Sequence, residues 1–102
     1  MNNQMKISEI QIIPVNETEG LIAFCSFVLN DSIKFNSVAI YTKLDGGYRL
    51  VYPTKLLSEK KIPLFYPISN DVGKYIENKI VSHFENLMKK HDMYYGNRNP
   101  SN

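Results

Sequence analysis

The residues most suited to chemistry in this sequence are basic side chains near its middle. Lys55, Lys60 and Lys61 lie in a short polar segment, and Arg49 precedes them. Lysine ammonium groups contact phosphate oxygens and position a nucleic acid without reading its sequence. The paired donors of an arginine are suited to a bidentate contact with guanine. These residue types predict contact with a polyanion, with Arg49 as the candidate for a base contact.

The charge of the chain is distributed unevenly. Residues 1–42 carry two basic and four acidic side chains, whereas residues 43–102 carry ten basic and six acidic ones. Within residues 43–61 the counts are five and two, so the excess gathers around the central lysines. A patch of this size fits either nucleic-acid contact or lysines that protect the edge of a sheet from aggregation.

Residues for catalysis or metal binding are sparse. His83 and His91 stand eight positions apart with no HExxH motif, and the single cysteine, Cys25, lies inside an apolar run. No serine-hydrolase elbow, phosphate-binding glycine loop or dinucleotide fingerprint occurs. The sequence has seven tyrosines, of which four suit strand packing at least as well as base stacking: Tyr41, Tyr48, Tyr52 and Tyr66. We expect a non-enzymatic protein with no metal, no cofactor and no small-molecule substrate.

Several apolar segments rich in aromatic and β-branched residues predict strands. They are Lys6–Val15, Leu21–Leu29, Ile33–Thr42, Tyr48–Tyr52 and Pro63–Ile68. The segments that separate them are rich in turn residues, at Asn16–Gly20, at Asn30-Asp31, at Asp45-Gly46-Gly47 and in a loop over Pro53–Lys61. This order predicts an antiparallel meander of about five strands.

A helix is expected from about Val72 to about Lys90, with Ser69 to Asp71 supplying an N-cap and an acidic first turn. Its apolar residues recur at helical spacing and mark one buried stripe. The stripe is Ile76, Ile80, Phe84, Leu87 and Met88. We therefore predict an α+β fold in which one long C-terminal helix packs on the sheet. Residues 1–91 form a single domain, and residues 92–102 are expected to be a disordered tail.

Leu21–Leu29 has apolar side chains on both faces of the predicted strand, and one helix covers only one face of a sheet. An exposed apolar patch of that size is unusual on a monomer, so we predict a homodimer. Apolar runs are too short to cross a membrane, and the N-terminus has no secretory apolar region. A cytoplasmic location without membrane contact is the expectation.

Two short motifs point to a known family. Val51-Tyr52-Pro53-Thr54-Lys55 resembles an apolar-x-Pro-Ser-Lys segment, and Tyr66-Pro67-Ile68 resembles a His-Pro-Ile segment that shortly precedes a helix. The two segments that they resemble are characteristic of the SpoVG family (stage V sporulation protein G, septation regulator). The resemblance of this chain to the family extends over about Lys6 to Lys90. Leu56 stands where the family has a second basic residue. Gly73 occupies the position at which the family has an arginine in the first turn of the helix, and Lys74 is the next residue.

The resemblance implies a small bacterial α+β dimer in the cytoplasm that binds DNA and RNA. Such proteins regulate gene expression and, in spore formers, septation in the cell cycle and sporulation. We therefore predict a dimeric nucleic-acid-binding regulatory protein. Its predicted contact residues are Arg49, Lys55, Lys60, Lys61 and Lys74. The alternative is a protein–protein interaction adaptor that uses the uncovered sheet face and does not bind nucleic acid.

Overall fold

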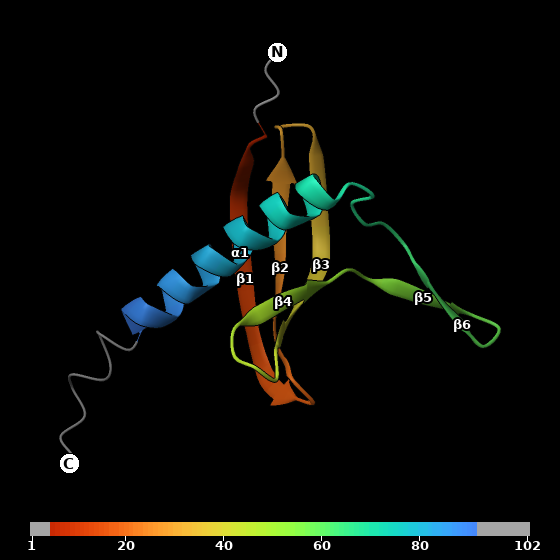
Figure 1. The fold of residues 1–102 in the computed structure, drawn as a ribbon, viewed down its shortest axis with the longest axis horizontal. Helices are drawn as coiled ribbons and strands as arrows, with labels where there is room; N and C mark the ends of the chain where they lie inside the picture. Colours follow the sequence, from red (N-terminus) through yellow and green to blue (C-terminus); the bar gives the residue numbers. More distant parts are fainter. Residues whose placement is uncertain (1–4, 92–102) are drawn as a thin grey trace.

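A computed structural model describes residues 5–91 as an α+β fold (Figure 1). In chain order its elements are β1 (Ile7–Thr18), β2 (Leu21–Leu29), β3 (Ile33–Thr42), β4 (Tyr48–Val51), β5 (Thr54–Leu57), β6 (Lys60–Pro63) and α1 (Asn70–His91). The first four strands form one antiparallel sheet in the order β1-β2-β3-β4, and β5 pairs with β6 separately. The predicted fold class is confirmed. The predicted tail at 92–102 lies outside the described residues.

Tight turns set the register of the first three strands. Glu19 and Gly20 join β1 to β2 with φ values of 53° and 92°. Asn30 and Asp31 follow β2 with φ values of 53° and 55°, and Ser32 N–H donates to the Leu29 carbonyl at 3.0 Å. Two successive positive φ values define a type I′ turn, whose twist matches that of the flanking strands. The predicted turn at Asn30-Asp31 is confirmed. The one at Asn16–Gly20 is too long, because β1 continues to Thr18.

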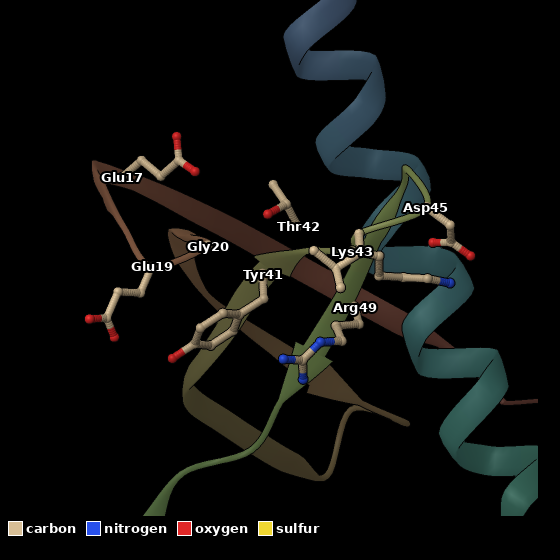
Figure 2. A pocket seen from close by; sticks show the side chains of 9 residues that line it. Glu17, Glu19, Gly20, Tyr41, Thr42, Lys43, Asp45 and Arg49 are labelled. Carbon is tan, nitrogen blue, oxygen red and sulfur yellow. The ribbon is translucent and has the colours of Figure 1, made fainter.

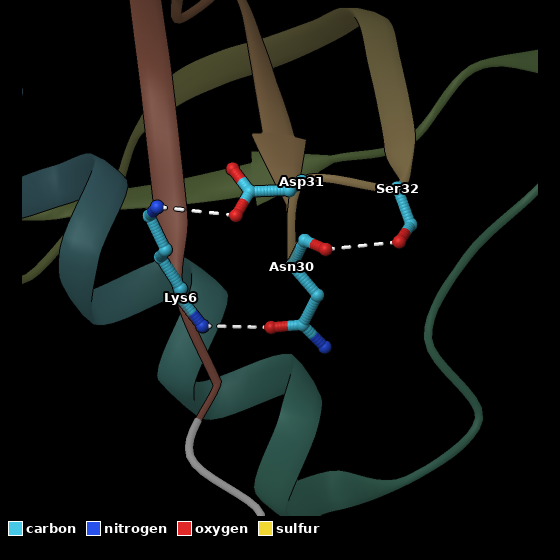
Figure 3. Close-up of polar contacts among 4 residues, drawn as sticks. All are labelled: Lys6, Asn30, Asp31 and Ser32. Atoms are coloured by element: carbon cyan, nitrogen blue, oxygen red, sulfur yellow. Dashed lines mark hydrogen bonds and ion pairs between the residues drawn. The ribbon is translucent and has the colours of Figure 1, made fainter.

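The turn after β2 also fastens the start of β1. The backbone N–H of Lys6 donates to Asn30 Oδ1 at 2.8 Å, and Lys6 Nζ lies 3.2 Å from Asp31 Oδ2 (Figure 3). Ser32 Oγ donates to the Asn30 carbonyl at 2.9 Å. Because both charged side chains are exposed, the ion pair itself contributes little to stability. The backbone contact is the stronger constraint on where β1 begins.

The core lies between the sheet and α1 (Figure 1). Alternate residues of β2 and β3 are buried there against the middle of the helix. They are Ala23, Cys25, Phe27, Val38 and Ile40 from the strands, and Ile76, Ile80 and Phe84 from α1. The predicted alternation of side chains between the two faces of β2 is therefore confirmed for the face that packs on the core. Ser69 Oγ accepts a bond from Val72 N–H at 3.3 Å, as expected of the N-cap.

The helix departs from the prediction at its C-terminal end. Leu87 and Met88 are each 42% exposed, although they continue the spacing of the buried stripe. Figure 1 shows the reason, because the last turns of α1 extend past β1, where the sheet has ended. The predicted stripe is correct as far as Phe84 and wrong beyond it. Among residues 5–91 no helix combines the length and apolar character needed to cross a membrane.

The segment after β4 differs most from the prediction. The expected fifth strand at Pro63–Ile68 is wrong, because only Pro63 of that segment is in a strand, and Pro67 has no N–H for a ladder. The expected loop is instead the hairpin of β5 and β6, with Ser58 at a φ of 57° in its two-residue turn. We call this hairpin, residues 54–63, the arm. Within residues 5–91 it packs against no other strand or helix, and Figure 1 shows it projecting from the body.

The core makes one prediction about stability. Phe84 is 4% exposed, and its ring meets Tyr48 edge-to-face with a centroid distance of 5.0 Å. Phe84→Ala should therefore lower the free energy of unfolding by about 3–5 kcal/mol in a urea titration. Leu87→Ala, three residues on and 42% exposed, is the matched control and should cost far less. Equal losses for the two variants would show that the sheet extends under the whole helix.

Candidate nucleic-acid interface

The three predicted lysines of the central segment lie on the arm. Partners across the arm are Lys55 with Ile62 and Leu57 with Lys60, and paired residues share a face. Lys55 and Lys60 therefore lie on one face beside Leu57 and Ile62. Lys61 pairs with Leu56 and lies on the opposite face. The structure brings the three lysines onto one narrow exposed ribbon but divides them between its two sides.

Arg49 lies in a different environment, at the start of β4. Its guanidinium carbon lies 5.1 Å from the ring centroid of Tyr41, the residue opposite it on β3. These two side chains line a shallow hollow together with Lys43 and the carboxylates of Glu17, Glu19 and Asp45, so three acidic groups there stand against two basic ones (Figure 2). Neighbouring carboxylates repel phosphate, and a guanidinium against an aromatic ring is oriented for stacking. This hollow suits the edge or face of a base better than a phosphate group.

Lys74, the last predicted contact residue, is exposed on the N-terminal part of α1. A Cβ at the preceding Gly73 would lie 3.5 Å from Pro67 Cγ, so position 73 faces the connector that follows the arm. The five predicted residues thus occupy three elements: the arm, β4 and α1. Only Lys55, Lys60 and Lys61 share one element.

The root of the arm is held by aromatic packing that the sequence analysis did not identify. Tyr52 lies two residues before the arm, and Phe65 lies two residues after it. Both rings meet Phe35 of β3 edge-to-face, with centroid distances of 6.5 Å for Tyr52 and 5.5 Å for Phe65. Tyr52 and Phe65 also contact each other at 6.3 Å, and Phe35 stacks on buried Phe27 at 5.0 Å. We call Phe35, Tyr52 and Phe65 the aromatic clamp. The N–H of Leu64 donates to the carbonyl of Pro53 at 2.9 Å. This hydrogen bond joins the two chain segments between the aromatic clamp and the arm.

Burial in the core changes the acidity of two groups. It raises the pKa of Tyr52 to about 12, and electrostatic interactions with Cys25 and Glu77 add to the effect. It also raises the pKa of the Cys25 thiol to about 12. A buried thiol with a raised pKa is a poor nucleophile at neutral pH. Cys25 therefore serves the core, where it is 3% exposed, and not a reaction.

Metal binding has little support in the described part of the chain. No group of three or more His, Cys, Asp and Glu side chains among residues 5–91 is placed so that it could hold a metal ion. His83 and His91 both lie on α1. His91 borders an apolar groove at the overhanging end of the helix, beside Ile12, Pro14 and Met88.

Comparison with known proteins adds no identification, because no protein-family model and no curated protein matches this chain. The resemblance to the SpoVG family stays a prediction that rests on two motifs. In the fold, the first motif runs from the end of β4 into the arm, and the second lies in the connector before α1. The first motif therefore includes Tyr52 of the aromatic clamp and the first two residues of the arm, and the second motif directly follows Phe65.

The raised pKa of Tyr52 predicts how stability depends on pH. The unfolded chain releases the tyrosine proton near the ordinary pKa of 10.0, whereas the folded protein keeps it until about 12. The contribution of Tyr52 to stability is therefore fully present below pH 10 and is lost as the pH rises from 10.0 to about 12. Tyr52→Phe should make that loss less steep in denaturant titrations at successive pH values. Tyr66→Phe changes an exposed tyrosine, so the parent's profile should persist, and identical profiles for all three proteins would contradict the assignment.

Proposed function

We propose that this protein is a dimeric nucleic-acid-binding regulator of gene expression in the bacterial cytoplasm. DNA and RNA are its candidate ligands, and septation and sporulation are the processes that the SpoVG resemblance suggests. The proposal does not involve an enzymatic step, a cofactor or a metal. It assigns phosphate contact to the arm and a secondary role to Arg49 and Lys74.

The observation that carries the proposal is the arm with its three lysines. Every residue of β5 and β6 is exposed, so the ammonium groups of Lys55, Lys60 and Lys61 are free to approach a phosphate backbone. Glu59 is the one acidic residue among them, which leaves the arm with a clear positive charge. Phosphate contacts of this kind supply affinity that is independent of sequence and sensitive to salt.

Sequence preference would come from a second location. Arg49 stacks on Tyr41 in a hollow bordered by carboxylates, and both guanidinium and aromatic surfaces stack on unpaired bases. A dimer carries two such hollows and two arms. We therefore expect salt-sensitive binding with limited selectivity, and a stronger selectivity on single strands than on duplexes.

An adaptor function is the second candidate, and one observation favours it. The face of the four-stranded sheet opposite α1, here called the outer face, carries exposed Ile13 and Phe24 side by side. Exposed apolar surface of this kind commonly contacts another protein. Affinity for short DNA and RNA at two salt concentrations separates the candidates. A steep loss with salt supports the regulator, and no binding at low salt supports the adaptor.

The arm lysines make the first functional prediction. Lys55→Ala, Lys60→Ala and Lys61→Ala together should weaken binding similarly for all sequences. On duplex DNA the slope of log K against log salt should flatten by about 0.9 for each phosphate that the variant no longer neutralises. The melting temperature should hardly change, because the arm packs against no other element among residues 5–91.

A matched control removes the same charge elsewhere. Lys34→Ala, Lys89→Ala and Lys90→Ala together also eliminate three lysines but leave the arm intact. Parent and variants should be compared at concentrations at which their sedimentation coefficients are equal, so that all are in the same oligomeric state. If the control flattens the salt slope as much as the arm variant does, general charge and not the arm binds nucleic acid.

Arg49 should behave differently from the lysines. Arg49→Ala removes the side chain stacked on Tyr41, so it should reduce the difference in affinity between guanine-containing and guanine-free single strands. The salt slope should change by no more than the effect of one phosphate, roughly 0.7 for single strands. Arg49→Lys keeps the charge and removes the planar donor pair, so it should also abolish the preference. Retained preference in both variants would remove Arg49 from the interface.

A further inference from the structure

The arm lacks a packing partner within its own chain. Neither of its strands packs against another element among residues 5–91, yet its apolar side chains are well exposed. Leu57 and Ile62, on the same face, are 48% and 41% exposed. A two-stranded hairpin alone is marginally stable in water and needs a hydrophobic contact to persist. The arm therefore requires a surface that the rest of the described chain does not provide.

The outer face of the sheet, like the arm, has exposed apolar side chains against which no element of residues 5–91 packs. The strand register aligns Ile13 with Phe24, Phe24 with Ala39, and Ala39 with Val51, so one apolar row crosses all four strands. Their sequence neighbours on β1–β3 face the core under α1. Ile13 is 64% exposed and Phe24 36% exposed. Ala39, in the middle of the row, is buried at 8% exposure, so the open part of the row is its Ile13 and Phe24 end. Within residues 5–91 no helix or strand covers that end.

The arm and the outer face do not satisfy each other within one chain, because the arm projects away from the sheet (Figure 1). A foreign partner would have to match each surface separately. A second copy carries both, and a twofold axis that brings one arm to the other sheet repeats the contact automatically. The charges also match, since the arm is basic and the exposed carboxylates of Glu17, near the end of β1, and Glu19, in the turn to β2, follow Ile13 in the chain.

We propose that two copies of this chain exchange arms. Leu57 and Ile62 of each chain pack on Ile13 and Phe24 of the other, and the long stems of Lys55 and Lys60 carry their charges to the rim of the contact. Lys61, on the opposite face of the arm, points away from the partner. This inference rests on the homodimer of the proposed function and specifies which surfaces form it.

The test uses two double variants that keep strand propensity while removing apolar surface, since threonine suits a strand. The arm variant is Leu57→Thr with Ile62→Thr, and the face variant is Ile13→Thr with Phe24→Thr. Sedimentation equilibrium should show each variant dimerising roughly tenfold or more weakly than the parent, because each substitution weakens both arm–sheet interfaces of the dimer. Leu44→Thr is the control, because this fully exposed residue lies on neither surface, and it should dimerise as the parent does.

Mixing the two variants gives the decisive measurement. A mixed dimer pairs the intact arm of the face variant with the intact face of the arm variant, so one of its two interfaces is restored. The other interface carries both changes, but it loses little more than a singly changed one, because either change alone already removes the contact between the two surfaces. The equimolar mixture should therefore dimerise more tightly than either variant alone. If sheets instead pack face to face, the arm variant dimerises like the parent. That result overturns arm exchange, as does a mixture no tighter than its components.

The same experiments separate this inference from the proposed function. A parent protein that sediments as an 11.8 kDa monomer at micromolar concentration overturns arm exchange, whatever it binds. A dimer that recovers on mixing but binds no oligonucleotide leaves arm exchange intact and removes the nucleic-acid role. The circular-dichroism spectrum of the arm variant serves as the folding check, because the melting temperature falls whenever a dimer weakens.

Discussion

The packing of α1 on β2 and β3 is the constraint from which the rest of the structure follows. Ile76, Ile80 and Phe84 are almost fully buried against alternate residues of the two strands. A sheet has two faces, and this chain supplies one helix among its described residues. Covering one face leaves the other open, and it also fixes the direction in which the chain leaves β4. The open outer face and the projecting arm are therefore two consequences of one packing choice.

The aromatic clamp connects that core to the candidate interface. Phe35 stacks on Phe27 of the core and meets both Tyr52 and Phe65, which lie on either side of the arm in the sequence. Aromatic pairs of this geometry contribute to stability beyond the area they bury, so the root of the arm is well defined. The arm itself packs against no other strand or helix among residues 5–91. The packed root therefore fixes where the arm leaves the body, and the three lysines on the arm stay exposed to a partner.

The parts of this fold that the sequence predicted are those set by local pattern. Alternation identified the core side of β2, the Asn30-Asp31 pair identified a turn, and helical spacing identified α1. The arm was missed because its turn, Ser58-Glu59, lacks the glycine or asparagine typical of tight hairpins, and its exposed strands show no burial alternation. Periodicity also could not show where the sheet ends, so Leu87 and Met88 were wrongly placed in the core. The lysines were predicted by type, but which face each occupies depends on hairpin register.

The charge asymmetry of the sequence becomes a spatial separation in the fold. Acidic Glu17 and Glu19 lie near the end of β1 and in the turn to β2, whereas the basic arm follows β4 and projects beyond β3 (Figure 1). Attraction between copies and attraction to phosphate would therefore draw on the same arm charges, and salt screens both. Apolar contact by Leu57 and Ile62 resists salt, however, whereas phosphate contact does not. The two roles are thus compatible only if apolar surface holds the dimer together and the lysines are left for the polyanion. Lys61 lies on the arm face away from the contact, and the long stems of Lys55 and Lys60 carry their charges to its rim.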